Sequence, residues 1–161
     1  DRLFLDANVL FSAAYRPDAG LRRLWGIVGA QLITSAYAEE EARRNTETPV
    51  QRATLSEFLR HVRVLIFQSG SSLFPSGLDL PDNDRPILEA ALFSHATHLL
   101  TGGMKAFGAY YGRTLAGVLI LRLLRISVSI DKSDTNAPYV SPRRLFSGSL
   151  RLSREIRNSR M

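Results

Sequence analysis

The strongest constraint on the fold is an alternation along the chain between short apolar runs and segments with helical spacing of apolar residues. The apolar runs have the length of buried strands, and the segments between them have one apolar helical face. This alternation is typical of a mostly parallel sheet covered by helices on both faces. We therefore expect an α/β fold, a three-layer α/β/α sandwich with four or five strands. The expected strands are residues 3–5, 31–34, 64–67, 98–101 and 117–121.

The predicted helices lie between these strands, and two of them have clear signals at their N-termini. Ser35 is a good N-cap residue for a helix from Ala36 to Arg44. A later helix is expected to begin near Asp82, Asn83 or Asp84, with Pro86 in its first turn, where a missing N–H is harmless. The remaining expected helices cover residues 8–15, 21–28 and 51–62.

The charge of the chain is unevenly distributed and suggests a domain boundary. Residues 1–121 contain 12 Lys/Arg and 12 Asp/Glu, whereas residues 122–161 contain 9 and 3, which is the whole net charge of +6. The strand and helix pattern is complete by Leu121. We therefore expect one domain over 1–121 and a poorly packed, basic, Ser/Arg-rich extension over 122–161. Such a segment is either a solvated tail or a binder of phosphate backbones, and it is either a genuine extension or the product of a shifted reading frame.

Composition excludes several classes of protein. There is no cysteine, so disulfides and thiolate zinc sites are absent, which fits a reducing compartment. No apolar run reaches the roughly 20 residues that a membrane span needs. The start of the chain does not combine a basic region with a long apolar one, so no signal peptide is expected. These features lead us to expect a cytoplasmic protein with no membrane partner.

Acidic residues follow several of the predicted strands. Asp6 ends the first, Glu39–Glu41 lie in the helix after the second, and Asp82 and Asp84 precede the fourth. Ligands of parallel α/β sheets collect at the carboxyl ends of the strands, so these acids could converge on one edge. Clustered carboxylates repel one another unless a cation neutralises them, and hard oxygen ligands suit Mg²⁺ or Mn²⁺. The pattern favours metal-assisted phosphodiester hydrolysis, although many α/β proteins have acids at these places.

Four sequence blocks together resemble the PIN-domain family. They are LFLDANVLFSA at 3–13, ITSAYAEEEARRN at 33–45, LPDNDRPILEAALFSHATHLLTGGMKAFG at 80–108 and GVLIL at 117–121. The third block is the most specific, and the resemblance covers about residues 2–121. It implies an α/β/α sandwich and a Mg²⁺- or Mn²⁺-dependent ribonuclease of the kind found as the toxin in toxin–antitoxin pairs. It also implies RNA as substrate, an antitoxin protein as partner, and a homodimer.

The resemblance assigns roles to individual residues. Asp6, Glu41 and Asp84 match the family's catalytic, metal-binding acids, and Glu40 is the alternative to Glu41. Asn8 and Thr101 match polar positions near the metal. Gly103 stands where the family's fourth acid is expected, which leaves open whether the chain is active.

Each assignment has a structural alternative. Asp6 could simply end a strand, and Asp82 or Asp84 could cap a helix. Glu39 or Glu40 could pair with Arg43 or Arg44 at helical spacing. The histidines, His61, His95 and His98, have no metal-ligand spacing, so structural roles are expected. Two other functions stay open: a catalytically inactive RNA-binding or protein-interaction module on the same fold, and an unrelated α/β small-molecule domain.

Overall fold

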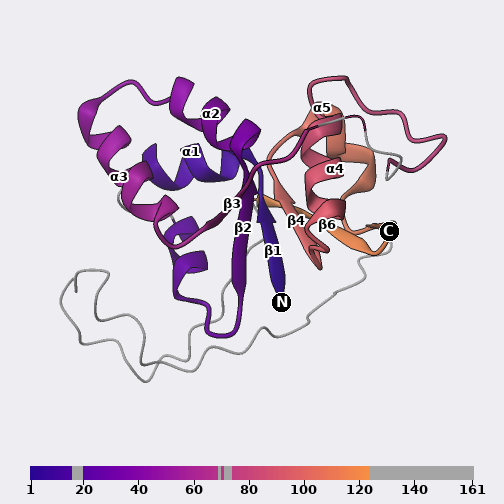
Figure 1. Cartoon of the computed structure of the whole chain (residues 1–161), viewed down its shortest axis with the longest axis horizontal. Helices are drawn as coiled ribbons and strands as arrows, with labels where there is room; N and C mark the ends of the chain where they lie inside the picture. The colour runs from indigo at the N-terminus through magenta and orange to yellow at the C-terminus, as the bar shows by residue number, and fades with distance from the viewer. Residues whose placement is uncertain (16–19, 69, 71–73, 124–161) are drawn as a thin grey trace, which may run out of the picture.

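The structure, a computed structural model, describes residues 1–15, 20–68, 70 and 74–123. In this part of the chain a six-stranded sheet forms the centre of the molecule (Figure 1). Its strands are β1 (Arg2–Leu5), β2 (Gln31–Ser35), β3 (Arg63–Leu65), β4 (His98–Thr101), β5 (Thr114–Leu115) and β6 (Val118–Arg122). They lie in the order β3-β2-β1-β4-β6-β5, and all neighbours are parallel except β5 and β6.

The predicted fold class is confirmed, with one strand more than expected. The five predicted strands correspond to β1, β2, β3, β4 and β6. The additional strand β5 is two residues long, too short to show any alternation in sequence. It forms a hairpin with β6 through Ala116 and Gly117, which both have positive φ angles of 45° and 92°. Two central residues with positive φ are typical of the tight turns that suit the twist of a hairpin.

The helices are α1 (Ala7–Tyr15), α2 (Ala36–Arg44), α3 (Pro49–Leu59), α4 (Arg85–Phe93) and the single turn α5 (Met104–Phe107), with 3₁₀ segments η1 (Gly20–Gly26) and η2 (Gly108–Tyr110). Ser35 caps α2 as predicted, because its hydroxyl accepts from the Ala38 N–H at 3.2 Å. The helix predicted over 21–28 is instead the 3₁₀ segment η1. Glycines at both of its ends disfavour a longer α-helix there.

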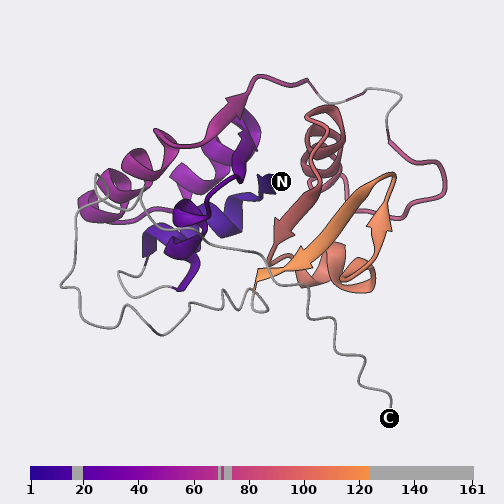
Figure 2. The same cartoon turned by 90° about the horizontal axis from the view of Figure 1, so that it is seen from below.

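The helices form two layers around the sheet. In Figure 1, α1, α2 and α3 lie towards the end of the sheet formed by β2 and β3, and α4 and α5 lie towards the end formed by β4 and β6; Figure 2 shows the same left-to-right arrangement from below. Helix α1 packs against α2 and α3, whereas α4 packs against β2 and β4 and touches α2. Fully buried apolar side chains from the sheet and from both helical layers, among them Phe4, Leu10 and Leu88, form the core.

The order of the strands changes direction between β1 and β4. From β1 the chain continues to β2 and β3 on one side of β1, and then crosses to β4 and β6 on the other side. The strand order therefore reverses between β1 and β4. Open parallel sheets bind ligands at such a reversal, in the crevice outside the carboxyl ends of the strands.

The predicted basic extension over 122–161 lies outside the described residues, apart from its first two. Arg122 is the last residue of β6, and Leu123 follows it. Among the described helices, none has the length and apolar character needed to cross a membrane.

Candidate functional site

Asp6 lies directly after β1, at the reversal of the strand order. Its side chain is only 4% exposed. One carboxylate oxygen, Oδ1, accepts from the Ala7 N–H at 2.6 Å. The other, Oδ2, accepts from the Asn8 side-chain amide at 2.8 Å and from the Thr101 hydroxyl at 2.6 Å. Asp6 is therefore a buried carboxylate held in one orientation by three donors.

Asn8 and Thr101 join Asp6 to the end of β4. The Asn8 Oδ1 accepts from the Gly102 N–H at 2.7 Å, and the Thr101 hydroxyl accepts from the Gly103 N–H at 3.0 Å. Both side chains are thus fixed on two sides, with one contact to Asp6 and one to the backbone after β4. This network places the two polar residues of the predicted site, and Gly103, beside Asp6.

The environment of Asp6 disfavours its charged form. Burial is the largest effect, and together with repulsion from the Glu41 carboxylate it outweighs the three hydrogen bonds and raises the pKa of Asp6 to about 6. Asp6 forms no ion pair with any residue that the structure describes. A buried carboxylate without a cationic partner is costly in free energy, so this position suits a bound cation.

The three glutamates of α2 separate into two roles. Glu39 pairs with Arg43 at 2.9 Å and Glu40 pairs with Arg44 at 3.3 Å, in the predicted i,i+4 arrangement. Glu41 has no ion-pair partner within the described part of the chain, and its carboxylate repels that of Asp6. Between the two candidates left open by the sequence, the ion pair of Glu40 and the repulsion between Glu41 and Asp6 therefore favour Glu41 as the acid that acts on Asp6.

Asp84 occupies the N-cap position of α4 but does not act as a side-chain cap. Its carboxylate makes no capping hydrogen bond, although it is half-buried, and burial raises its pKa. The neighbouring Asp82 is 96% exposed and lies 3.6 Å from Arg85. Asp82 is therefore a solvent-exposed acid, whereas the Asp84 carboxylate has no capping hydrogen bond.

Tyr37, which the sequence did not single out, connects the two sides of the site. Its hydroxyl donates to the carbonyl of Asn83 at 3.3 Å, so it links α2 to the residue before Asp84. Burial raises the pKa of Tyr37, and the negative charges of Glu41, Asp84 and Asp6 act in the same direction. The charges of all three predicted acids therefore act on one phenol.

The acids nevertheless do not form a closed set of ligands. Among the residues that the structure describes, no three Asp, Glu, His or Cys side chains are close enough to hold one metal ion. Asp6, Glu41 and Asp84 are together called the acidic rim below, and their convergence within reach of one ion stays a prediction. The chemistry of the pair Asp6 and Glu41 fits a hard cation that keeps several of its waters, as Mg²⁺ does.

Gly103 leaves room for a side chain in this rim. Its φ angle of −69° is ordinary for any residue. A Cβ atom at this position would lie 3.3 Å from the Thr101 hydroxyl oxygen and 3.6 Å from the nearest ring carbon of Phe107. A carboxylate at 103 would therefore stand next to the hydroxyl that holds Asp6, after a small adjustment of Thr101.

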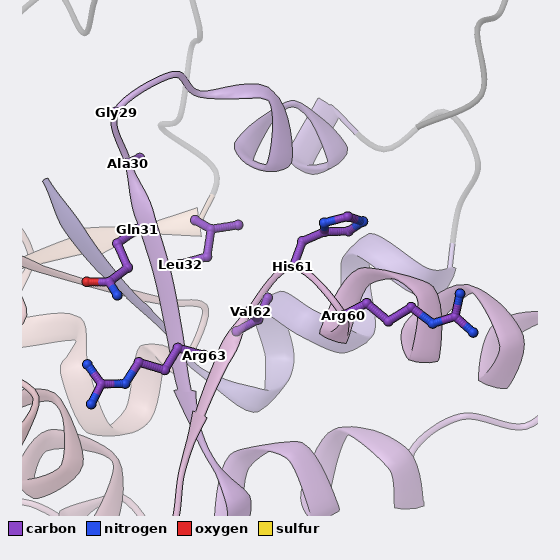
Figure 3. Close-up of a pocket in the computed structure, with 8 residues that line it drawn as sticks. All are labelled: Gly29, Ala30, Gln31, Leu32, Arg60, His61, Val62 and Arg63. Carbon is purple, nitrogen blue, oxygen red and sulfur yellow. The ribbon is translucent and has the colours of Figure 1, made fainter. Parts of the chain in front are cut away.

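A cavity in the described residues lies away from this site. It has a volume of about 690 Å³ and is lined at the amino ends of β2 and β3 by residues that include Gln31, Arg60, His61 and Arg63 (Figure 3). None of the predicted acids contributes to it. His95 and His98 also lie at the amino end of the sheet, before and at the start of β4. The histidines are therefore remote from Asp6 along the strands.

Comparisons with known proteins identify the fold. No protein-family model matches the chain, and no curated protein is significantly similar to it. Among solved structures, the crystal structure of VapBC2 from Rickettsia felis bound to a DNA fragment from their promoter contains a similar chain, with a TM-score of 0.54 and 15% identity. The match covers 76% of this chain and 98% of that one. At this identity the likeness shows a shared α/β fold.

The raised pKa of Asp6 predicts how stability depends on pH. Folded Asp6 has a pKa of about 6, against 3.8 for the free group, so between these values the folded state binds more protons than the unfolded state. The free energy of unfolding should therefore fall as pH rises from about 4 to about 6, by about 3 kcal/mol from this group. Urea unfolding in EDTA across this range measures the fall.

The Asp6→Asn variant serves as the reference for this measurement. It removes the titrating group while keeping the size of the side chain, so its stability should depend less on pH over the same range. Equal pH dependence in the two proteins would show that Asp6 does not titrate with a raised pKa.

Proposed function

We propose that this chain is a PIN-type, Mg²⁺- or Mn²⁺-dependent endoribonuclease and the toxin of a toxin–antitoxin pair, with activity reduced by Gly103. The observation that carries the proposal is Asp6, a buried carboxylate without an ion-pair partner among the described residues, at the reversal of the strand order. The sequence blocks that resemble PIN domains and the α/β fold support the same conclusion.

Each residue of the candidate site has a separate role in the proposed reaction. Asp6 and Glu41 would hold the ion, and Asn8 and Thr101 orient the Asp6 carboxylate. When bound, the ion supplies an activated water and stabilises charge on the phosphate. Asp84, which is half-buried and makes no capping bond, would be the third acid of the site.

The proposed partners follow from the same comparison. The PIN resemblance implies an antitoxin protein and a homodimer, and the similar chain belongs to VapBC2 bound to DNA from their promoter. These facts support a protein partner for this chain. RNA remains the proposed substrate, since the candidate site contains the acids expected for phosphodiester hydrolysis.

A second function is favoured by two specific observations. Glycine stands at position 103, and no three-acid ligand group occurs in the described residues. A catalytically inactive RNA-binding or protein-interaction module on the same fold would have these properties. RNA binding that is insensitive to Mn²⁺, without cleavage, would select this alternative.

Cleavage of single-stranded RNA in Mn²⁺ tests the main proposal. The wild-type chain should cleave slowly, and Asp6→Asn should reduce the rate by more than about 100-fold, since even changes behind a metal ligand cost 10–100-fold. The matched control is Asp82→Asn, which changes a carboxylate that is 96% exposed. Equal rates for Asp6→Asn and wild type would rule out Asp6 as a catalytic residue.

Neighbouring glutamates of α2 provide a second matched pair. Glu41→Gln should lower the Mn²⁺-dependent rate by about 10-fold or more, because it removes a proposed ligand. Glu40→Gln should leave the rate within about 2-fold, because Glu40 is paired with Arg44 on an exposed helix face. The reverse order of effects would assign the ligand to Glu40.

Replacing Gly103 tests the reason for reduced activity. Gly103→Asp should raise both Mn²⁺ affinity and the cleavage rate, and should slightly destabilise the metal-free fold through repulsion between carboxylates. Gly103→Asn, of similar size and uncharged, should give neither gain. A folded Gly103→Asp protein with unchanged cleavage and unchanged Mn²⁺ affinity would contradict the nuclease assignment.

A further inference from the structure

Arg122 extends a row of polar residues across the carboxyl edge of the sheet. In the register of the parallel strands, Leu5 pairs with Leu100, and Thr101 pairs with Arg122. Asp6 therefore lies beside Thr101, as their hydrogen bond confirms, and Thr101 lies beside Arg122. Paired residues of neighbouring parallel strands direct their side chains to the same face. Arg122 thus stands two strands from Asp6, with Cα atoms about 10 Å apart.

The guanidinium of Arg122 has no side-chain partner in the described part of the chain. It is half-buried, and it makes no side-chain hydrogen bond or ion pair with any residue that the structure describes. In particular it does not pair with Asp6. Five N–H donors are therefore available next to, but not on, the acidic rim.

Tyr111 locates the charge of Arg122 relative to the site. The Tyr111 hydroxyl donates to the Thr101 carbonyl at 3.4 Å, which places the phenol over the end of β4. The pKa of Tyr111 is raised by burial, lowered by the Arg122 cation and raised by the Asp6 anion. The charges of Arg122 and Asp6 therefore both act on the Tyr111 phenol, which lies next to Thr101.

We propose that Arg122 binds a phosphodiester group of the RNA strand beside the acidic rim. A planar guanidinium matches the oxygens of a phosphate in a bidentate manner, and no acid among the described residues forms an ion pair with this one. The position suits a strand whose scissile group lies near Asp6, because the phosphate and the two charges would occupy one edge of the sheet. This inference rests on the proposed function for its substrate class.

The chain offers a matched control. Arg63 is an exposed arginine at a strand end and has no side-chain partner in the described residues. It lines the cavity at the amino ends of β2 and β3 (Figure 3). Arg122→Met and Arg63→Met remove the same charge from opposite edges of the sheet. Any binding by the basic residues beyond 123 is the same in both variants.

Fluorescence anisotropy with a labelled single-stranded RNA, in EDTA and over a series of salt concentrations, measures the effect. Arg122→Met should weaken binding about tenfold and reduce the slope of log affinity against log salt by about 0.7, the value for one phosphate contact on a single strand. Arg63→Met should stay within about 2-fold of wild type. Arg122→Lys should keep the salt slope and lose part of the affinity, because it keeps the charge without the planar fork.

The same proteins assayed for cleavage in Mn²⁺ separate this inference from the proposed function. If the wild type cleaves RNA while Arg122→Met and Arg63→Met bind it equally well, the phosphate site is wrong and the nuclease stands. If Arg122→Met alone loses affinity but the wild type does not cleave, the phosphate site stands and the nuclease is wrong. A wild type that neither binds nor cleaves RNA overturns both. Unfolding curves identify any variant that fails to fold, and Arg122→Lys then decides the result.

Discussion

The structure of the candidate site depends on one hydrogen bond, from the Thr101 hydroxyl to the Asp6 carboxylate. It joins the ends of β1 and β4 where the strand order reverses, and the Asn8 side chain reinforces it through Gly102. These contacts fix a carboxylate in a buried position that it would otherwise leave for water. The orientation of Asp6 is therefore set by the sheet itself, and the helices on either side contribute the remaining acids.

This arrangement lowers the stability of the metal-free protein and favours a cation. Burial and the Glu41 carboxylate raise the pKa of Asp6, so deprotonation at neutral pH carries a free-energy penalty in the fold. A bound cation reverses that penalty, because it stabilises the charged form. Arg122 stands at the other end of the same row of residues, where it does not neutralise Asp6. Negative and positive groups are thereby kept apart along one edge of the sheet.

The sequence predicted the backbone framework and the position of Asp6 directly after the first strand, whereas features set by tertiary contacts were not predictable. Asp6 and Thr101 end apolar runs, so the edge they share followed from parallel pairing. The choice between Glu40 and Glu41 depends on how α2 is rotated against the sheet, which a run of three glutamates does not encode. Tyr37, Tyr111 and Arg122 come near the acids through a helix contact, a loop and cross-strand register, and none has a local sequence signal. The buried acid Glu89 on α4, whose carboxylate accepts from the Gly70 N–H at 3.0 Å, was missed for the same reason.

The most direct test of the account is calorimetric titration of Mn²⁺ into the metal-free protein, with Asp6→Asn as the comparison. The account predicts binding of an ion to the wild type at pH 7, with affinity that falls as pH is lowered through about 6, where Asp6 takes up a proton. Asp6→Asn should lose this binding while remaining folded. Equal Mn²⁺ affinity in the two proteins, or wild-type affinity that does not change between pH 7 and pH 5, would contradict the assignment of Asp6 as the centre of a metal site.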